Sequence, residues 1–256
     1  MTDLTFLDEL ADAAARETLP RFRSRLAIAN KMAAGFDPVT EADRAAEEAI
    51  RSLISARFPD HGILGEEHGK TNAGNRHLWV IDPIDGTRSY ISGIPVWGTL
   101  VGLYEDGRAR LGLMDQPFTG ERFLAGPEGA FYRRSGEERP LRVSDCDDLA
   151  AATLFTTSPH LHQGDRREPY LALERSVKLA RYGCDCYAFA MLAAGNIDIV
   201  AEPGLKPYDI AGLIPIIEQA GGVVTTWQGE RPEQGGDVVA CATRPLHEKA
   251  LAILGG

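Results

Sequence analysis

The stretch WVIDPIDGTRSYISG, residues 79–93, runs an apolar segment directly into two aspartates that stand three positions apart. The apolar segment predicts a strand that delivers Asp82 at its carboxyl end, and Pro83 forces an extended turn immediately after it. Asp85 can then turn back toward Asp82, with the carbonyl oxygen of Ile84 between the two side chains. The sequence therefore predicts a group of oxygen atoms at the end of an apolar strand.

The two residues that follow Asp85 are suited to bind an anion. Gly86 allows a close backbone approach, and the amides of Gly86 and Thr87 are free to face a phosphate. Acidic oxygens beside such amides are what a metal-bridged phosphate requires, because Mg²⁺ takes hard oxygen ligands. The simpler alternative is that Asp-Pro and Asp-Gly are only turn-forming pairs. The residue spacing of an EF-hand calcium loop is absent.

Three further acidic residues occupy comparable positions elsewhere in the chain. Glu66 follows another short apolar run in GILGEEHG, residues 62–69. Asp43 forms a capping-box pattern with Thr40, so helix capping alone could explain this carboxylate. Asp209 stands at a predicted helix start, where it could either cap the helix or hold a cation.

Composition and charge limit the partners of this chain. The 256 residues are 44% hydrophobic, which is enough for one large domain or for two closely packed halves. The net charge of −10 argues against a nucleic-acid partner, because phosphate backbones bind clustered Lys and Arg. A small phosphorylated metabolite remains compatible, since bound divalent cations can reverse the charge inside one pocket.

The sequence also bears on membranes and redox state. No apolar run approaches the roughly 20 residues that a membrane span needs, so no membrane partner is expected. The acidic N-terminal stretch does not resemble a signal or transit peptide, and the four cysteines show no disulfide or paired CxxC spacing. We therefore expect a reduced, cytoplasmic protein in which Cys184 and Cys186 are buried helix residues.

Two helices are expected near the N-terminus. The first ends or bends near Pro20, and the second covers residues 38–60. A third motif helix, residues 208–222, should be kinked by Pro215. The apolar stripe of the second helix is expected to consist of Ala45, Ala46, Ala49, Ile50, Leu53 and Ile54.

Strands and helices interleave along the chain in a way that indicates layered α/β structure. Short strands with a hairpin turn at Asp106–Gly107 predict an antiparallel meander, and the later part alternates strands with helices. We expect an N-terminal half, 1–145, that carries the metal-site motifs and a C-terminal half, 146–256, that carries specificity elements. The two halves should form one compact unit.

Four motifs together resemble the inositol monophosphatase-like family of metal-dependent sugar and small-molecule phosphatases. They are VTEAD, GEEHG, DPIDGT and YDIAGLIPIIEQAGG, and the similarity spans nearly the whole chain. The resemblance implies a sandwich of α, β, α, β and α layers with the active site between the halves. It also implies a homodimer.

The resemblance further implies two or three Mg²⁺ ions per active site. Glu66, Asp82 and the carbonyl of Ile84 would hold one ion. Asp82, Asp85 and Asp209 would hold a second, so that Asp82 bridges both. Glu66 would help to place a third, weaker ion.

By the same resemblance, the reaction is direct attack by a metal-activated water on the phosphate, without a phosphoenzyme. Phosphate would bind at Asp85 and at the amides of Gly86 and Thr87. Thr87 and Asp43 would orient the water and take its proton, with Glu66 as a further catalytic group.

The C-terminal half should set the substrate. Asp185 stands where inositol phosphatases typically carry a small neutral residue, and Glu202 matches the acidic substrate-contacting position of the family. Two carboxylates favour a substrate with amine and imidazole groups, and Arg88 is a third candidate contact. Residues 86–103 and 183–202 also resemble the histidinol-phosphate phosphatase branch, so hydrolysis of L-histidinol phosphate in histidine biosynthesis is the leading hypothesis.

Several alternatives stay open at this point. Asp185 could simply be a helix N-terminal residue that the macrodipole favours. Inositol 1-phosphate or another small sugar phosphate could be the substrate, and a non-catalytic regulatory binding protein is the alternative outside enzymes. His160 and His162 are expected in a surface loop rather than at a zinc site. Trp79 and Trp97 are expected in the core.

Overall fold

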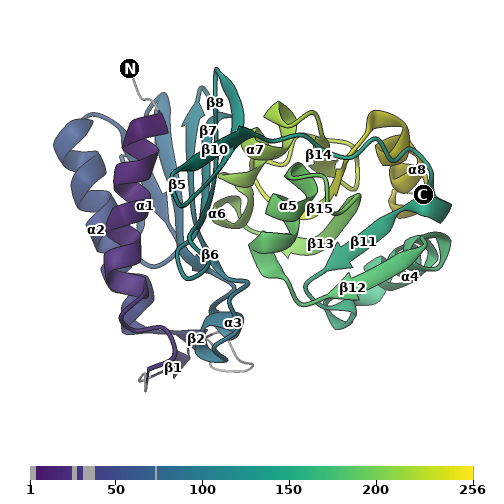
Figure 1. Cartoon of the computed structure of the whole chain (residues 1–256), viewed down its shortest axis with the longest axis horizontal. Coiled ribbons are helices and arrows are strands. Elements are labelled where there is room, and N and C mark those ends of the chain that lie inside the picture. The colour runs from purple at the N-terminus through teal and green to yellow at the C-terminus, as the bar shows by residue number, and fades with distance from the viewer. Residues whose placement is uncertain (1–3, 25–27, 31–37, 73, 256) are drawn as a thin grey trace.

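The computed structural model describes residues 4–24, 28–30, 38–72 and 74–255. Five layers follow one another across the molecule, in the order α, β, α, β and α (Figure 1). The first layer is the helix pair α1 (Leu4–Thr18) and α2 (Glu41–Arg57), which packs on the larger sheet. The layered α/β fold expected from the sequence is confirmed.

The larger sheet has eight strands in the order β10-β9-β8-β7-β6-β5-β3-β4. Its neighbouring strands run antiparallel except for the parallel pair β3 and β5. The predicted hairpin turn at Asp106–Gly107 and the meander that follows are confirmed. The strands are β3 (Gly62–Gly65), β4 (Gly69–Thr71), β5 (His77–Asp85), β6 (Gly98–Glu105), β7 (Arg108–Gln116), β8 (Glu121–Gly126), β9 (Gly129–Arg134) and β10 (Glu137–Pro140).

The smaller sheet has five strands in the order β12-β11-β13-β15-β14. Strand β11 runs parallel to β12 and β13, whereas β15 is antiparallel to both of its neighbours. These strands are β11 (Thr153–Thr156), β12 (Leu179–Tyr182), β13 (Ile199–Leu205), β14 (Val223–Thr226) and β15 (Gly236–Cys241).

The remaining elements complete the layers. Helices α5 (Asp185–Ala193), α6 (Pro207–Ile210) and α7 (Leu213–Gln219) lie between the two sheets, and α4 (Arg167–Ser176) and α8 (Arg244–Leu254) form the outer layer (Figure 1). Shorter elements are β1 (Ala29–Asn30), β2 (Pro38–Val39), α3 (Thr87–Ile91) and the 3₁₀ helices η1 (Leu149–Ala151), η2 (Pro159–Leu161) and η3 (Gly164–Arg166).

Helix α2 buries the expected apolar stripe only in part, since Ala46, Ile50 and Ile54 lie in the core as predicted. Ala45, Ala49 and Leu53 are only half-buried, whereas Asp43 and Glu47 are fully buried. The buried rows are therefore those that begin at Ala42 and Asp43 and repeat every four residues. Carboxylates tolerate this burial only because hydrogen bonds satisfy them. The predicted core positions of Trp79 and Trp97 are confirmed.

The third motif helix is two helices, so the expectation of one helix kinked at Pro215 was wrong. The chain breaks at Ala211–Gly212, between α6 and α7, and Pro215 lies in the first turn of α7. Proline has no N–H to donate to the carbonyl four residues earlier, and that carbonyl belongs to Ala211. The missing hydrogen bond coincides with the point where the helix breaks.

The break presses its backbone against the larger sheet at two strand glycines. A Cβ on Gly102 would lie 2.6 Å from the carbonyl carbon of Ala211, and one on Gly112 would lie 2.1 Å from the carbonyl oxygen of Gly212. The backbone of the helix break therefore contacts the backbone of the sheet directly. Any side chain larger than that of glycine would hold the two layers apart. This close approach sets how near α6 comes to the ends of β5 and β6.

The larger sheet ends at Pro140 and the smaller sheet begins at Thr153. A single hydrophobic cluster nevertheless joins Leu100 and Phe123 of the first to Val200 and Val238 of the second, through α5 and α7. The division into halves 1–145 and 146–256 stays a prediction. In the part of the chain that the structure describes, no helix has the length and apolar character to cross a membrane.

We expect Gly112→Ala to destabilise the protein by about 1–3 kcal/mol, because the new methyl group overpacks the contact with Gly212. Thermal denaturation measures the loss. The control is Gly74→Ala, where a Cβ meets no atom within 4 Å. An unchanged melting temperature in Gly112→Ala would show that the layers can separate at no cost.

Candidate active site

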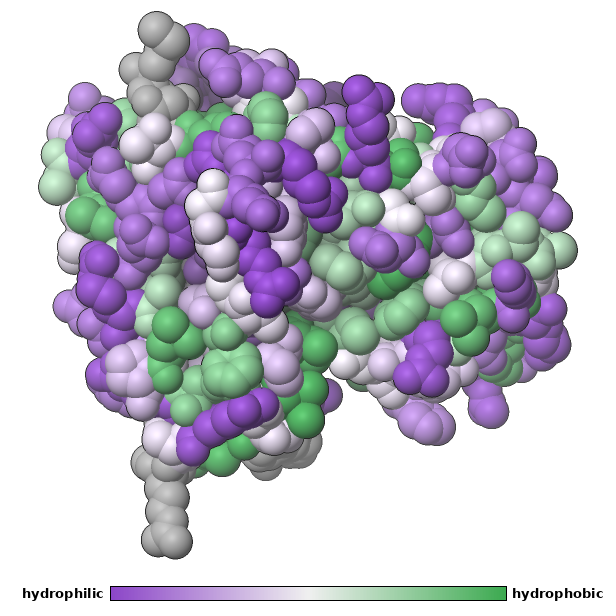
Figure 2. Space-filling model, in the orientation of Figure 1, coloured by the Kyte–Doolittle hydropathy of each residue, from purple (hydrophilic) through white to green (hydrophobic). Residues whose placement is uncertain are grey.

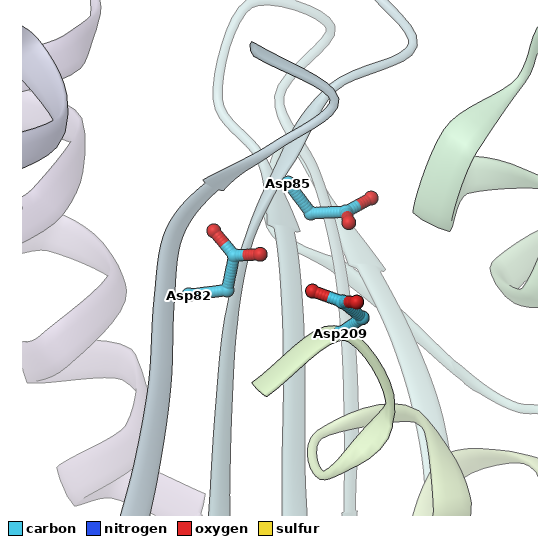
Figure 3. A group of neighbouring side chains, drawn as sticks. All are labelled: Asp82, Asp85 and Asp209. Atoms are coloured by element: carbon cyan, nitrogen blue, oxygen red, sulfur yellow. The ribbon is translucent and has the colours of Figure 1, made fainter. Parts of the chain in front are cut away.

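Three carboxylates converge where the larger sheet meets the middle layer. Asp82 and Asp85 come from the carboxyl end of β5, and Asp209 comes from α6 (Figure 3). One carboxylate oxygen of each residue lies within 4.8 Å of the other two. Oxygen-only donors at this spacing suit a hard divalent cation such as Mg²⁺.

A bulge in β5 explains why two aspartates three apart face the same space. Asp82 pairs with Leu100 of β6, but Asp85 pairs with Gly98, so three steps along β5 match two along β6. In a regular strand, residues three apart point to opposite faces. The extra residue returns Asp85 to the side of Asp82. The N–H of Ile84 donates to Asp82 Oδ1 at 3.1 Å and fixes the turn.

The electrostatics of this cluster call for positive charge. Burial raises the pKa of Asp82 most, and the nearby carboxylates of Glu66 and Asp85 raise it further. Burial likewise raises the pKa of Asp85, followed by the charge of Asp209. Like charges held together out of water destabilise one another unless a counter-charge lies between them. A bound divalent cation would supply that charge.

Glu66 reaches the cluster because β3 runs parallel to β5. The Glu66 N–H donates to the carbonyl of Ile81 at 3.2 Å, which places the residue beside Asp82. Asp209 has the double role that the sequence left open. Its Oδ2 accepts the Lys206 N–H at 2.7 Å and caps α6, while the carboxylate also faces Asp82 and Asp85.

Asp43 also caps a helix and faces the site, using one oxygen for each task. Its Oδ2 accepts hydrogen bonds from the N–H and hydroxyl of Thr40, at 2.8 and 2.6 Å. Its Oδ1 lies 3.4 Å from Thr87 Oγ1, which lies 3.1 Å from the carbonyl of Ile84. Burial raises the pKa of Asp43 despite the hydrogen bonds from Thr40. The structure therefore brings the predicted hydroxyl–carboxylate pair together.

Gly86 and Arg88 lie at the mouth of the site. Gly86 has a φ of 82° and precedes α3, and a Cβ there would lie 3.0 Å from the carboxyl group of Asp185. A cavity of about 390 Å³ opens beside these residues, and both halves of the chain contribute to its wall. It is lined by Glu66, Asp85, Gly86, Thr87, Arg88, Thr157, Asp185, Pro203, Gly204, Leu205, Lys206, Tyr208 and Asp209.

The volume of a cavity does not by itself identify the active site. A larger cavity of about 580 Å³ lies against α1 and the meander. Asp8, Arg122 and Arg133 in its wall are already ion-paired with one another. The smaller cavity is the one that adjoins the carboxylate cluster.

Asp185 is the first residue of α5 and is held tightly against the site. Its Oδ2 accepts the Ser89 hydroxyl at 2.5 Å, and its φ of 44° lies in the left-handed region that disfavours most residues. The next N–H, that of Cys186, donates to Asp85 Oδ2 at 2.7 Å. Burial raises the pKa of Asp185, whereas Ser89 and Arg88 lower it. Helix position and site contact therefore coexist at this residue.

Glu202 ends the regular part of β13 and is almost completely buried. Burial raises its pKa to about 8, although hydrogen bonds from the N–H of Thr157 and the hydroxyl of Thr156 oppose the shift. A small cavity of about 40 Å³ joins Glu202 to Asp185 and to the Asp85–Asp209 pair. The two predicted specificity carboxylates thus lie on one side of the cluster.

Sequence reasoning missed Glu47, which supports the Glu66 loop from behind. Its carboxylate accepts the N–H groups of Glu67 and His68, at 2.7 and 3.2 Å, and pairs with Arg51 at 2.6 Å. A Cβ on Gly65 would lie 1.8 Å from Glu47 Oε1, so only glycine fits there. Two features of the sequence could have indicated its role. Glu47 lies four residues before Arg51, as in a helical ion pair, and four residues after Asp43, on the same face of the helix.

The expectation of a surface loop holds for His160 but was wrong for His162. His160 is exposed, whereas His162 is buried and stacks on Tyr170 with ring centroids 3.7 Å apart. The His162 ring packs in the interior beside Tyr170 and so does not lie on the surface. Cys186 is buried in α5 as predicted, and Cys184 is half-buried just before it.

We expect Glu47→Gln to raise the Mg²⁺ concentration for half-maximal phosphatase activity roughly 10- to 100-fold. That is the usual effect of removing a group that orients a metal ligand, and a neutral amide accepts the two N–H groups less strongly. The measurement is a Mg²⁺ titration of phosphate release. The matched control is Glu48→Gln, the exposed neighbour on the same helix, which should behave as wild type. Equal titrations for both variants would reject the role of Glu47.

The chain has clear relatives. The model of the "Inositol monophosphatase family" matches residues 2–255. A protein of Arabidopsis thaliana named "Bifunctional phosphatase IMPL2, chloroplastic" is 42% identical over 257 residues, covering 96% of this chain and 72% of the relative. A histidinol-phosphatase of Chlorobaculum parvum is 37% identical and covers 99% of this chain and 96% of its own.

The solved structure of an inositol monophosphatase from Zymomonas mobilis superimposes with a TM-score of 0.87. It is 37% identical, and the match covers 99% of this chain and 98% of that one. Two proteins of equal identity to this chain therefore carry different substrate names. The choice between substrates has to be made from the site itself.

Proposed function

The chain belongs to the inositol monophosphatase family of phosphatases, and we propose that within it the enzyme hydrolyses L-histidinol phosphate to L-histidinol and phosphate. The family is metal-dependent and acts on small phosphorylated substrates. The observation that carries the proposal is the pair of carboxylates beside the acidic cluster, the half-buried Asp185 and the buried Glu202. Histidinol offers an amine and an imidazole to these carboxylates, whereas inositol offers only hydroxyl groups.

We assign two to three Mg²⁺ ions to this site, following the resemblance. Glu66, Asp82 and the Ile84 carbonyl would hold the first ion, and Asp82, Asp85 and Asp209 would hold the second. Glu66 would also help to place a third. When bound, such ions lower the pKa of a water and neutralise charge on the phosphoryl oxygens.

The protein's own groups would position the phosphate and the attacking water. The amides of Gly86 and Thr87 lie at the start of α3, beside Asp85, and their N–H groups suit the phosphate oxygens. Thr87 Oγ1 can accept a hydrogen bond from the water while its own proton points to Asp43 Oδ1. The water proton would pass through Thr87 toward Asp43, and the water oxygen would bond to phosphorus as the bond from phosphorus to the histidinol oxygen breaks. The leaving oxygen would take up a proton from solvent to give the alcohol.

The substrate carboxylates would act through charge. Asp185 and Glu202 would contact the leaving group, and in support both line the small cavity beside Asp85 and Asp209. Each charge-assisted hydrogen bond to an ammonium or imidazolium contributes about 1.5–3 kcal/mol, which corresponds to a tenfold or greater preference. Arg88 stands at the mouth beside Asp185 and would balance its charge before substrate binds.

We also propose a homodimer and a cytoplasmic location. Ile94 and Phe118 are exposed, and hydrophobic side chains gather over the end of the molecule where α3 lies (Figure 2). Arg23 joins the two, since it stacks on the Phe118 ring at 4.4 Å and donates to the Gly93 carbonyl at 3.0 Å. Exposed apolar groups of this kind are typical of protein–protein contacts.

The substrate is tested by comparing kcat/KM for histidinol phosphate and for inositol 1-phosphate, each with Mg²⁺ and with a chelator. We expect at least a roughly tenfold preference for histidinol phosphate, lost without metal, and a similar loss of preference in Asp185→Asn. The matched control is Asp165→Asn, an exposed aspartate in η3. Faster turnover of inositol 1-phosphate would reverse the assignment, and no phosphate release from any ester would indicate a non-catalytic binding protein.

Asp43→Asn separates the catalytic role from the capping box, because the amide oxygen of asparagine can still accept the N–H of Thr40. We expect kcat to fall about 10²–10⁴-fold while the melting temperature stays close to that of wild type. Steady-state kinetics and thermal denaturation of the same preparation measure both effects. Turnover within about threefold of wild type would leave Asp43 as a cap only.

A further inference from the structure

His162, Thr156 and Glu202 form a continuous chain of polar contacts that leads from the interior to the substrate side of the site. Thr156 Oγ1 lies 3.1 Å from His162 Nε2 and 3.3 Å from Glu202 Oε2. Thr156 ends β11 and Glu202 stands on β13, two adjacent parallel strands, so both side chains emerge at the same sheet edge. All three side chains are buried.

The proton directions along this chain follow from what each group can donate. The Thr156 hydroxyl has one proton, so it donates to only one of its two neighbours. His162 Nδ1 is buried and has no hydrogen-bond partner among the described residues. A buried lone pair without a partner is tolerated more readily than a buried N–H without an acceptor. The proton of the neutral imidazole therefore belongs on Nε2, where it donates to Thr156.

With Nε2 as donor, Thr156 must pass its own proton to Glu202. The second oxygen of Glu202 accepts the backbone N–H of Thr157, which can only donate. Both carboxylate oxygens thus face donors supplied by the protein. Burial raises the pKa of Glu202 to about 8, and these two donors limit the rise because they favour the charged form.

Aromatic stacking holds the imidazole ring of His162 in one orientation. Its ring stacks on Tyr170 with an interplanar angle of 8° and lies parallel to the Trp227 ring, with centroids 5.7 Å apart. Burial lowers the pKa of His162 to about 4, so the ring stays neutral and keeps a single N–H. The ring can therefore neither flip nor gain a second proton without leaving its stack.

We propose that His162 is a positioning residue that, through the Thr156 hydroxyl, fixes Glu202 as a hydrogen-bond acceptor for a cationic group of the leaving alcohol. The inference rests on the proposed function, in which Glu202 contacts an ammonium or imidazolium. It makes His162 a determinant of specificity, although His162 contacts neither the cluster of acidic residues nor the substrate. His162 therefore acts on selectivity and not on the attack at phosphorus.

The test measures selectivity, defined as kcat/KM for histidinol phosphate divided by kcat/KM for inositol 1-phosphate. His162→Phe keeps the aromatic stack but removes the N–H, and Thr156→Val removes the hydroxyl with little change in shape. We expect either variant to lower selectivity about tenfold, through a higher KM for histidinol phosphate at nearly unchanged kcat. His162→Gln retains an N–H near the position of Nε2 and should recover most of the selectivity.

The chain offers a matched control in a second buried histidine. His247 Nε2 lies 2.8 Å from Thr225 Oγ1, but this hydroxyl donates to the backbone carbonyl of Thr226 and not to a carboxylate of the site. His247→Phe removes a comparable His–Thr contact from the same sheet. Its selectivity should stay within about twofold of wild type, even if its melting temperature falls.

The outcomes separate this inference from the proposed function. If wild type prefers histidinol phosphate but Thr156→Val and His162→Phe leave selectivity within about twofold, the role of His162 is rejected and the substrate assignment stands. If wild type prefers inositol 1-phosphate, both are rejected. Should His162→Phe fail to fold, Thr156→Val alone decides, because it leaves the aromatic stack untouched.

Discussion

Repulsion among acidic side chains is the constraint on which the rest of this structure depends. Asp82, Asp85 and Asp209 bring oxygens within 4.8 Å of one another in a largely buried place, and Glu66 adds to the same field. No chain would hold these groups together for stability alone, because each raises the free energy of its neighbours. The fold has to hold the carboxylates together, and a bound cation would offset their mutual repulsion.

Backbone geometry and side-chain hydrogen bonds to the backbone hold these residues in place. The bulge in β5 turns Asp85 toward Asp82, and the capping of α6 orients Asp209. Buried carboxylates behind the site act in the same way, since Glu47 holds the Glu66 loop by its amides and Asp43 caps α2 while facing Thr87. Groups that look purely structural in a hydrogen-bond inventory thus determine where the reactive oxygens lie.

The sequence predicted those features that depend on interactions between residues close together in the chain. The strand, turn and paired aspartates of DPIDGT, the capping box at Thr40 and the hairpin at Asp106 are all encoded within a few residues. The missed features depend on partners farther along the chain. Glu47 is buried because a loop 20 residues later uses its oxygens as acceptors, and His162 is buried because Tyr170 of α4 and Trp227 stack beside its ring. The contact of the helix break before α7 with Gly102 and Gly112 likewise depends on strands about a hundred residues earlier, which no helical pattern contains.

The close approach of α6 and α7 to the strand glycines has a consequence for how such an enzyme can change. Because main chain rests on main chain there, the position of the helix break that follows Asp209 depends mainly on backbone contacts. The wall near β11, η2 and α4 is held instead by side-chain contacts, such as the stack of His162 on Tyr170. Substitutions of these side chains can therefore change which leaving group the enzyme accepts, while the backbone contacts beside the acidic cluster stay the same.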